Sequence, residues 1–194
     1  MNELNQFEEN HSSGLVLIDT TFTNIAKSNL LLLKGFLDLE DKKGYFIAID
    51  RPHQYMAYLL NMHEVDYDHL WFIDTVSQVS GQKNVNSDNV NFLDGPFHIE
   101  QLLSVFEGAS ENSKNSLTSI DENDFIMIDN IFSMLKYNTK ESVEDFVGSF
   151  RELLSRYEGI IGTLVLDSES NPDLYDLIKN YVNKKINLEG MKDE

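Results

Sequence analysis

Aspartates stand at the ends of the most apolar segments of this chain, where they could do chemistry together. Short apolar segments are each followed at once by an acid: Asp19, Asp50, Asp74, Asp129 and Asp167. Carboxylates that meet at one place can bind a hard cation such as Mg²⁺ or share a proton. They can equally serve as turn formers and helix caps, which is the structural alternative to a functional role.

A lysine and a hydroxyl residue follow the first of these segments. Residues 21–28 have the sequence TFTNIAKS, which ends in Lys27 and Ser28 at the start of an expected helix. A lysine and a hydroxyl in this position can hold a nucleotide phosphate and its Mg²⁺, provided that the loop before them curls around the anion. A Lys-Ser pair also occurs often by chance, so the pair alone does not establish a nucleotide site.

These residues depend on the strands and helices that carry them. The apolar segments have no polar alternation, as expected of parallel strands covered on both faces. The expected strands are 14–18, 45–49, 70–73, 125–128 and 162–166, with a weaker candidate at 185–188. The expected helices are 26–39, 53–62, 97–106, 142–157 and 173–182. This order predicts a three-layer α/β/α sandwich with a mostly parallel central sheet, whose ligands bind beyond the carboxyl ends of the strands.

The chain length favours one domain. Its 194 residues suit a single core, with flexible tails expected at 1–12 and 189–194. Two long polar stretches, 78–94 and 110–123, are expected to be loops within that domain.

The composition excludes several functions. The chain has 15 basic and 33 acidic residues, a net charge of −18. Such a polyanion repels nucleic acids and anionic membranes, so neither is expected as a partner. There is no cysteine, which excludes disulfides and thiol catalysis. Because no apolar run could span a bilayer and residues 1–10 lack a basic leader, a cytoplasmic location is expected.

In its order of elements the chain resembles the RecA-type ATPases, particularly their KaiC-like branch. Their phosphate loop, G-x-x-x-x-G-K-[ST], follows the first strand, and Lys27 and Ser28 stand at its last two positions. The resemblance implies that Thr23, Lys27 and Ser28 would hold ATP. Segment 125–135 resembles the Walker B strand, with Asp129 as the acid that would hold Mg²⁺.

The resemblance fails at the residues that matter most for catalysis. Thr21 and Ala26 occupy the two glycine positions of the loop, and glycine is what lets the backbone N–H groups curl around one anion. Asp50 takes the place of the first of two catalytic acids, and Arg51 replaces the second. We therefore expect a dismantled loop, with Asp50 catalytic only if activity survives.

Three functions follow from these observations. The preferred one is a catalytically inactive RecA/KaiC-like homologue that serves as a regulatory or structural subunit and binds another protein, such as a RecA-like ATPase or a second copy of itself. The first alternative is a residual ATP-binding or hydrolysing enzyme that uses ATP and Mg²⁺.

The second alternative starts from Asp19. The segment Asp19-Thr-Thr-Phe-Thr23 matches D-x-[ST]-x-[ST], the metal-ion-dependent adhesion motif of von Willebrand A-type domains. Asp19, Thr21 and Thr23 would then be direct or water-mediated ligands of a divalent metal. The motif is short and recurs by chance.

Overall fold

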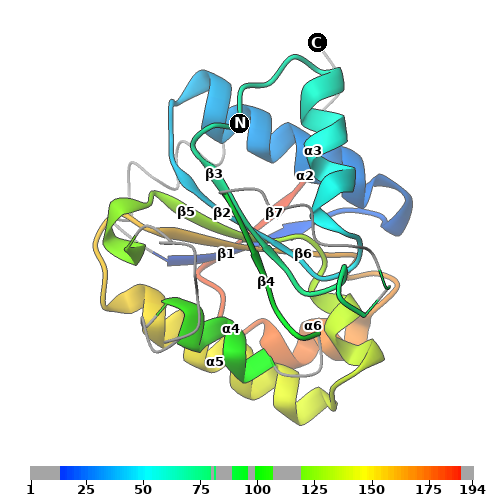
Figure 1. Ribbon diagram of the computed structural model, residues 1–194. Coiled ribbons are helices and arrows are strands. Elements are labelled where there is room, and N and C mark those ends of the chain that lie inside the picture. Colours follow the sequence, from blue (N-terminus) through cyan, green and yellow to red (C-terminus); the bar gives the residue numbers. More distant parts are fainter. Residues whose placement is uncertain (1–13, 80, 82–88, 96–98, 107–118, 189–194) are drawn as a thin grey trace.

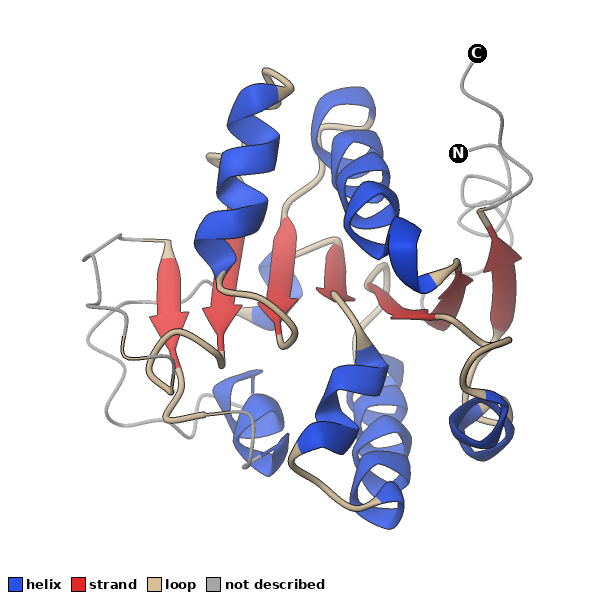
Figure 2. Cartoon of the chain, turned by 90° about the vertical axis from the view of Figure 1, so that its right-hand side faces the viewer, coloured by secondary structure: helices blue, strands red, loops and turns tan. Residues whose placement is uncertain are grey.

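The computed structural model describes residues 14–79, 81, 89–95, 99–106 and 119–188. One sheet lies between two layers of helices, as Figures 1 and 2 show from two directions. The tails expected at 1–12 and 189–194 lie outside the described residues, as does most of the expected loop at 110–123.

The sheet has seven strands in the described part of the chain, and every neighbouring pair is parallel. Their order is β4-β3-β2-β5-β6-β1-β7. The strands are β1 (Gly14–Asp19), β2 (Gly44–Ala48), β3 (Leu70–Asp74), β4 (Val90–Phe92), β5 (Phe125–Ile128), β6 (Ile161–Leu166) and β7 (Lys184–Asn187). The five strong strand predictions and the weaker sixth one are confirmed.

Strand β4 corrects one prediction. Residues 78–94 were expected to form a loop, yet Val90–Phe92 pair with β3 at the edge of the sheet. The strand is three residues long and has an asparagine at its centre. Its pairing therefore comes from the exposed edge of β3, because so short a segment has no apolar periodicity of its own.

The helices form two layers. Helix α2 (Ile25–Lys34), which continues as a π-helical turn (Gly35–Leu39), and α3 (His53–Met62) lie above the sheet in Figure 1. Helices α4 (Ile99–Phe106), α5 (Lys140–Ser155) and α6 (Pro172–Ile178) lie below it. The five expected helices are thus present; the helix at 53–62 has the expected bounds, and the others have shifted ends. Among the described residues, no helix is long and apolar enough to cross a membrane.

Each layer has its own core. On the α2 and α3 side, Phe36 stacks on Phe125 of β5 with 4.4 Å between the ring centroids. On the other side, α5 buries a stripe that includes Phe146 and Phe150, as its helical periodicity predicts. The strands are therefore covered on both faces, which explains their continuously apolar sequences.

The helices that follow the strands change from one face of the sheet to the other between β2 and β5, which are parallel neighbours. After β2 the chain enters α3 on one face, whereas after β5 it enters a 3₁₀ turn (Ile131–Lys136) and α5 on the other. In an open α/β sheet, such a switch point leaves a crevice beyond the carboxyl ends of the strands. The crevice is the expected place for a ligand.

Candidate pocket at the switch point of the sheet

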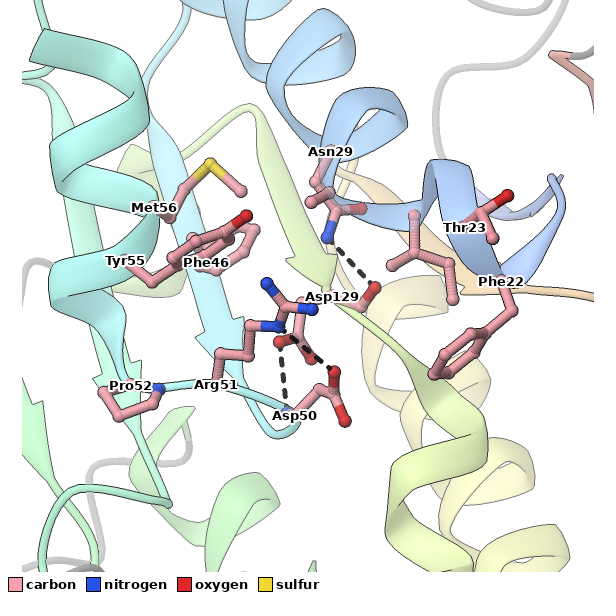
Figure 3. Close-up of a pocket in the computed structure, with 12 residues that line it drawn as sticks. Phe22, Thr23, Asn29, Phe46, Asp50, Arg51, Pro52, Tyr55, Met56 and Asp129 are labelled. Atoms are coloured by element: carbon pink, nitrogen blue, oxygen red, sulfur yellow. Dashed lines mark hydrogen bonds and ion pairs between the residues drawn. The ribbon is translucent and has the colours of Figure 1, made fainter. Parts of the chain in front are cut away.

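A pocket of about 140 Å³ lies at the switch point, shown in Figure 3. Its walls come from the start of α2, the ends of β2 and β5, and the first turn of α3. The lining residues are Phe22, Thr23, Ile25, Ala26, Asn29, Phe46, Asp50, Arg51, Pro52, Tyr55, Met56 and Asp129. Two of the predicted aspartates and one of the predicted cofactor-binding residues therefore share one pocket.

Asp129 lies at the floor of this pocket. Its Oδ1 accepts a hydrogen bond from the backbone N–H of Ile49 at 3.0 Å, and its Oδ2 accepts one from the N–H of Asp50 at 3.1 Å. Burial raises the pKa of Asp129 to about 7 although these backbone hydrogen bonds lower it, and the nearby charge of Asp50 raises it further. The carboxyl group is therefore expensive to keep ionised in the absence of a cation.

Asp50 has cationic and hydroxyl partners instead. Its Oδ1 accepts hydrogen bonds from Ser133 Oγ at 2.6 Å and Lys136 Nζ at 2.7 Å, both in the 3₁₀ turn after β5. Its Oδ2 lies 3.8 Å from Nε of Arg51, whose guanidinium stacks on Tyr55. Burial raises the pKa of Asp50, but the hydrogen bonds from Lys136 and Ser133 outweigh it and the pKa is lowered.

The segment expected to be a phosphate loop is hydrogen-bonded to another part of the chain. It passes from β1 directly into a 3₁₀ turn (Phe22–Asn24) and then into α2. Among the described residues outside glycine, positive φ occurs only at two positions, and neither lies in this segment. The backbone N–H of Phe22 donates to Oδ2 of Asp167 at 2.9 Å. The carboxylate that follows β6 thus accepts the hydrogen bond that a phosphate in this loop would need.

The predicted phosphate-binding residues lie in different surroundings. Ser28 is buried, and its hydroxyl lies 2.8 Å from that of Thr20. Lys27 is exposed on α2 and is not among the residues that line the pocket. Thr23 lines the pocket from an exposed position. The structure therefore does not bring Thr23, Lys27 and Ser28 around one anion.

Asp19 is separate from the pocket and already has partners. Its carboxylate accepts hydrogen bonds from the N–H and Oγ of Ser168 at 2.9 and 2.8 Å, and Lys185 Nζ lies 2.8 Å away. A metal ion at Asp19 would have to displace the lysine. Among the described residues, no three acidic or histidine side chains converge as a metal site would require.

Asp74 holds the wall of the pocket. It is fully buried and accepts hydrogen bonds from the backbone N–H and Nδ1 of His53, the first residue of α3, at 2.8 and 2.6 Å. Burial alone would raise the pKa of Asp74, but hydrogen bonds from His53 and Ser77 lower it to about 2. The pair fixes the start of α3 and so positions the residues of α3 that line the pocket.

Sequence reasoning missed Asn29. It lies on the buried side of α2, 3% exposed, and its Nδ2 donates to the backbone carbonyl of Asp129 at 3.1 Å. The other amide atom, Oδ1, is buried and has no hydrogen-bond partner. The available signal was the position itself, because Asn29 is a polar residue that directly precedes the leucines of the helix's buried side.

Comparisons with known proteins identify the fold. No family model matches the sequence, and no curated protein matches it. The KaiC-like protein PH0186 of the hyperthermophilic archaeon Pyrococcus horikoshii OT3 is similar in structure, with a TM-score of 0.58 and 14% identity over 94% of this chain and 75% of that one. The uncharacterized protein PH0321 of Pyrococcus horikoshii, solved in complex with an unknown peptide, has a TM-score of 0.59 and 14% identity over 90% of this chain and 76% of its own.

The fold is therefore that of the RecA/KaiC-like α/β proteins, and the predicted three-layer class is confirmed. At 14% identity the likeness concerns the fold alone. Activity depends on the pocket and the loop, since one fold supports many functions.

Proposed function

We propose that this chain is a RecA/KaiC-like homologue that does not hydrolyse ATP and that acts as a regulatory or structural subunit by binding another protein. The observation that carries the proposal is the hydrogen bond from the Phe22 N–H to the Asp167 carboxylate. A nucleotide phosphate at this loop would meet a fixed negative charge and would find the N–H group already engaged.

The pocket supports the same proposal. A volume of about 140 Å³ is below the 300–1,000 Å³ typical of pockets that enclose small molecules. Its polar floor presents the carboxylates of Asp50 and Asp129, which repel an anionic ligand. Asp50 is held by Ser133 and Lys136, so it would have to leave both to position an attacking water.

Protein binding is supported by two further facts. One structural neighbour, PH0321, carries a bound peptide, which shows that a protein of this fold can bind a polypeptide. The net charge of −18 would attract a basic partner and speed its association.

A nucleotide titration tests the proposal. The melting temperature is measured with Mg²⁺ alone and with Mg²⁺ plus ATP up to 1 mM. A site with a dissociation constant of about 10 µM would add about 2.7 kcal/mol at that concentration, or a shift of roughly 5–10 °C for a domain of this size. We expect a shift below about 1 °C and no ATP turnover.

Two lysines of the same helix give a matched control. Lys27→Ala removes the lysine at the motif position, and Lys34→Ala removes an exposed lysine at the other end of α2. An ATP-dependent rise that Lys27→Ala abolishes and Lys34→Ala preserves would overturn the proposal, because it would show that the loop still binds phosphate.

A further inference from the structure

Two buried polar residues that line the pocket, Asn29 and Asp129, carry hydrogen-bond acceptors. The Oδ1 of Asn29 is buried without a partner, and the donors to Asp129 next to it among the described residues are backbone N–H groups, those of Ile49, Asp50 and Asn130. The Asn29 Nδ2 bond to the Asp129 carbonyl places the two residues side by side, as Figure 3 shows. A buried acceptor without a donor costs about 1–3 kcal/mol. A ligand that brings N–H groups would remove that cost.

The charge of the pocket selects a cation. Asp129 has no ion pair among the described residues, whereas the carboxylate of Asp50 is already paired with Lys136 at 2.7 Å. Arg51, the one basic residue among the described residues that line the pocket, is half exposed at the rim and stacks on Tyr55 at 4.6 Å. Its Nε is 3.8 Å from Asp50 Oδ2, too far for a hydrogen bond. The deeper acceptors are therefore left for a cation from outside.

The walls of the pocket are apolar. Phe46, Met56 and Ile25 line it from the strand and from both helices, and the ring of Tyr55 faces it in Figure 3. Such walls pack well against an unbranched aliphatic chain. Lysine combines a four-carbon stem of this kind with a compact ammonium group that donates three hydrogen bonds.

We propose that the pocket takes a lysine side chain of a partner protein, with the stem between the apolar walls and the ammonium on Asp129 and on Oδ1 of Asn29. This inference rests on the proposed function, because it names the chemistry by which a partner would be recognised. The small volume fits a single inserted side chain, and buried anchors of this kind commonly dominate the affinity of an interface.

The experiment uses the full chain and two short peptides, acetyl-Gly-Lys-Gly-amide and the same peptide with norleucine in place of lysine. Norleucine keeps the aliphatic stem and removes the charge and the donors. Binding is followed by ¹⁵N–¹H chemical-shift changes during titration at neutral pH. We expect the lysine peptide to shift the amides of Asp50 and Asp129, and the norleucine peptide to bind at least tenfold more weakly.

Three variants localise the effect. Asp129→Asn removes the charge at the floor and should weaken binding of the lysine peptide at least tenfold. Ala26→Leu fills the pocket from α2 without changing any charge, and should have the same effect even if the first variant fails to fold. Asp173→Asn removes one exposed carboxylate far from the pocket and should leave binding unchanged.

The inference is overturned if the norleucine peptide binds as well as the lysine peptide, or if Ala26→Leu leaves the affinity unchanged. Equal weakening by Asp173→Asn would show general attraction to an acidic chain and would overturn it too. A third peptide, acetyl-Gly-Arg-Gly-amide, is titrated in the same way, and tighter binding of this peptide than of the lysine peptide would show that lysine is not the anchor. These results are independent of the ATP titration. If the lysine peptide does not bind and ATP does not shift the melting temperature, this inference is wrong but the proposed function is not contradicted.

Discussion

Replacing Asp74 with asparagine tests whether a buried acid holds the wall of the pocket. The Oδ2 of Asp74 accepts from His53 N–H, His53 Nδ1 and Ser77 Oγ at 2.6–2.8 Å. Its Oδ1 accepts from the N–H groups of Val76 and Ser77, both at 2.8 Å. An asparagine has one acceptor oxygen, so its NH₂ group must face donors on one side or the other.

The magnitude follows from these contacts. With the NH₂ group in place of Oδ1, the N–H groups of Val76 and Ser77 lose their acceptor. With it in place of Oδ2, the N–H of His53 loses its acceptor, and the His53 ring and the Ser77 hydroxyl have to change from donor to acceptor. Each buried donor without an acceptor costs about 1–3 kcal/mol. Asp74→Asn should therefore lower the free energy of unfolding by about 3–5 kcal/mol, the range seen when a buried pair is broken. A fully buried site gives little room for water to replace the missing acceptor.

Urea unfolding at pH 7 measures the effect. Asp173→Asn is the matched control, because its carboxylate is exposed and its one ion-pair partner in the described part of the chain is Lys140, so its unfolding midpoint should equal that of the wild type. The free energy of unfolding at low pH gives a second measurement. Because the pKa of Asp74 is lowered to about 2, its contribution of about 2 kcal/mol is present above pH 4 and is lost as the pH falls through 2. A loss below 1 kcal/mol at pH 7 would refute this account of the α3 anchor.

Two further perturbations follow from burial. Because burial raises the pKa of Asp129 to about 7, the folded state keeps a proton that the unfolded chain releases near pH 4, so the free energy of unfolding should fall by up to about 4 kcal/mol from pH 4 to 7. Urea midpoints at pH 5 and pH 8 measure this slope, which Asp129→Asn should flatten. Gly44→Ala should cost more than about 3 kcal/mol by thermal unfolding, since its Cβ would lie 2.4 Å from the carbonyl oxygen of Phe125. Gly148→Ala, whose Cβ would have the side-chain ring of Tyr181 as its nearest neighbour at 3.1 Å, should stay within about 1 kcal/mol of the wild type.

The sequence predicts the layers of this fold well because the sequence patterns of the strands and of the helices are both strong. Strands covered on two faces are continuously apolar, and helix α5 has a regular buried stripe. The short edge strand β4 has neither signal, because its pairing depends on the neighbouring β3 rather than on its own residues. The order of the strands was not predicted at all, since it depends on which helix packs on which face.

The site was predicted less well for a physical reason. The position of Asp129 and Asp50 beside each other follows from the rule that parallel strands end at one edge, and both line the pocket. What a side chain faces, however, depends on partners distant in sequence. Asp167 and Phe22, which are hydrogen-bonded, are 145 residues apart in the sequence, and Asn29 and Asp129 are 100 residues apart. No local sequence pattern predicts such contacts.

A row of carboxylates such as the strand-end aspartates has two interpretations, a structural role and a ligand-binding role. All five accept hydrogen bonds from the fold, but only four have side-chain donors among the described residues: Asp19 has Ser168 and Lys185, Asp50 has Ser133 and Lys136, Asp74 has His53 and Ser77, and Asp167 has Ser170. Asp129 has backbone donors. Hydrogen bonds lower the pKa values of Asp50, Asp74 and Asp167 despite burial, whereas burial raises that of Asp129. A carboxylate whose charge is already balanced gains little from a ligand. Asp129 is costly to ionise where it stands, so it has the most to gain from an incoming cation, and this difference makes the pocket, rather than the whole row, the place to look for a partner.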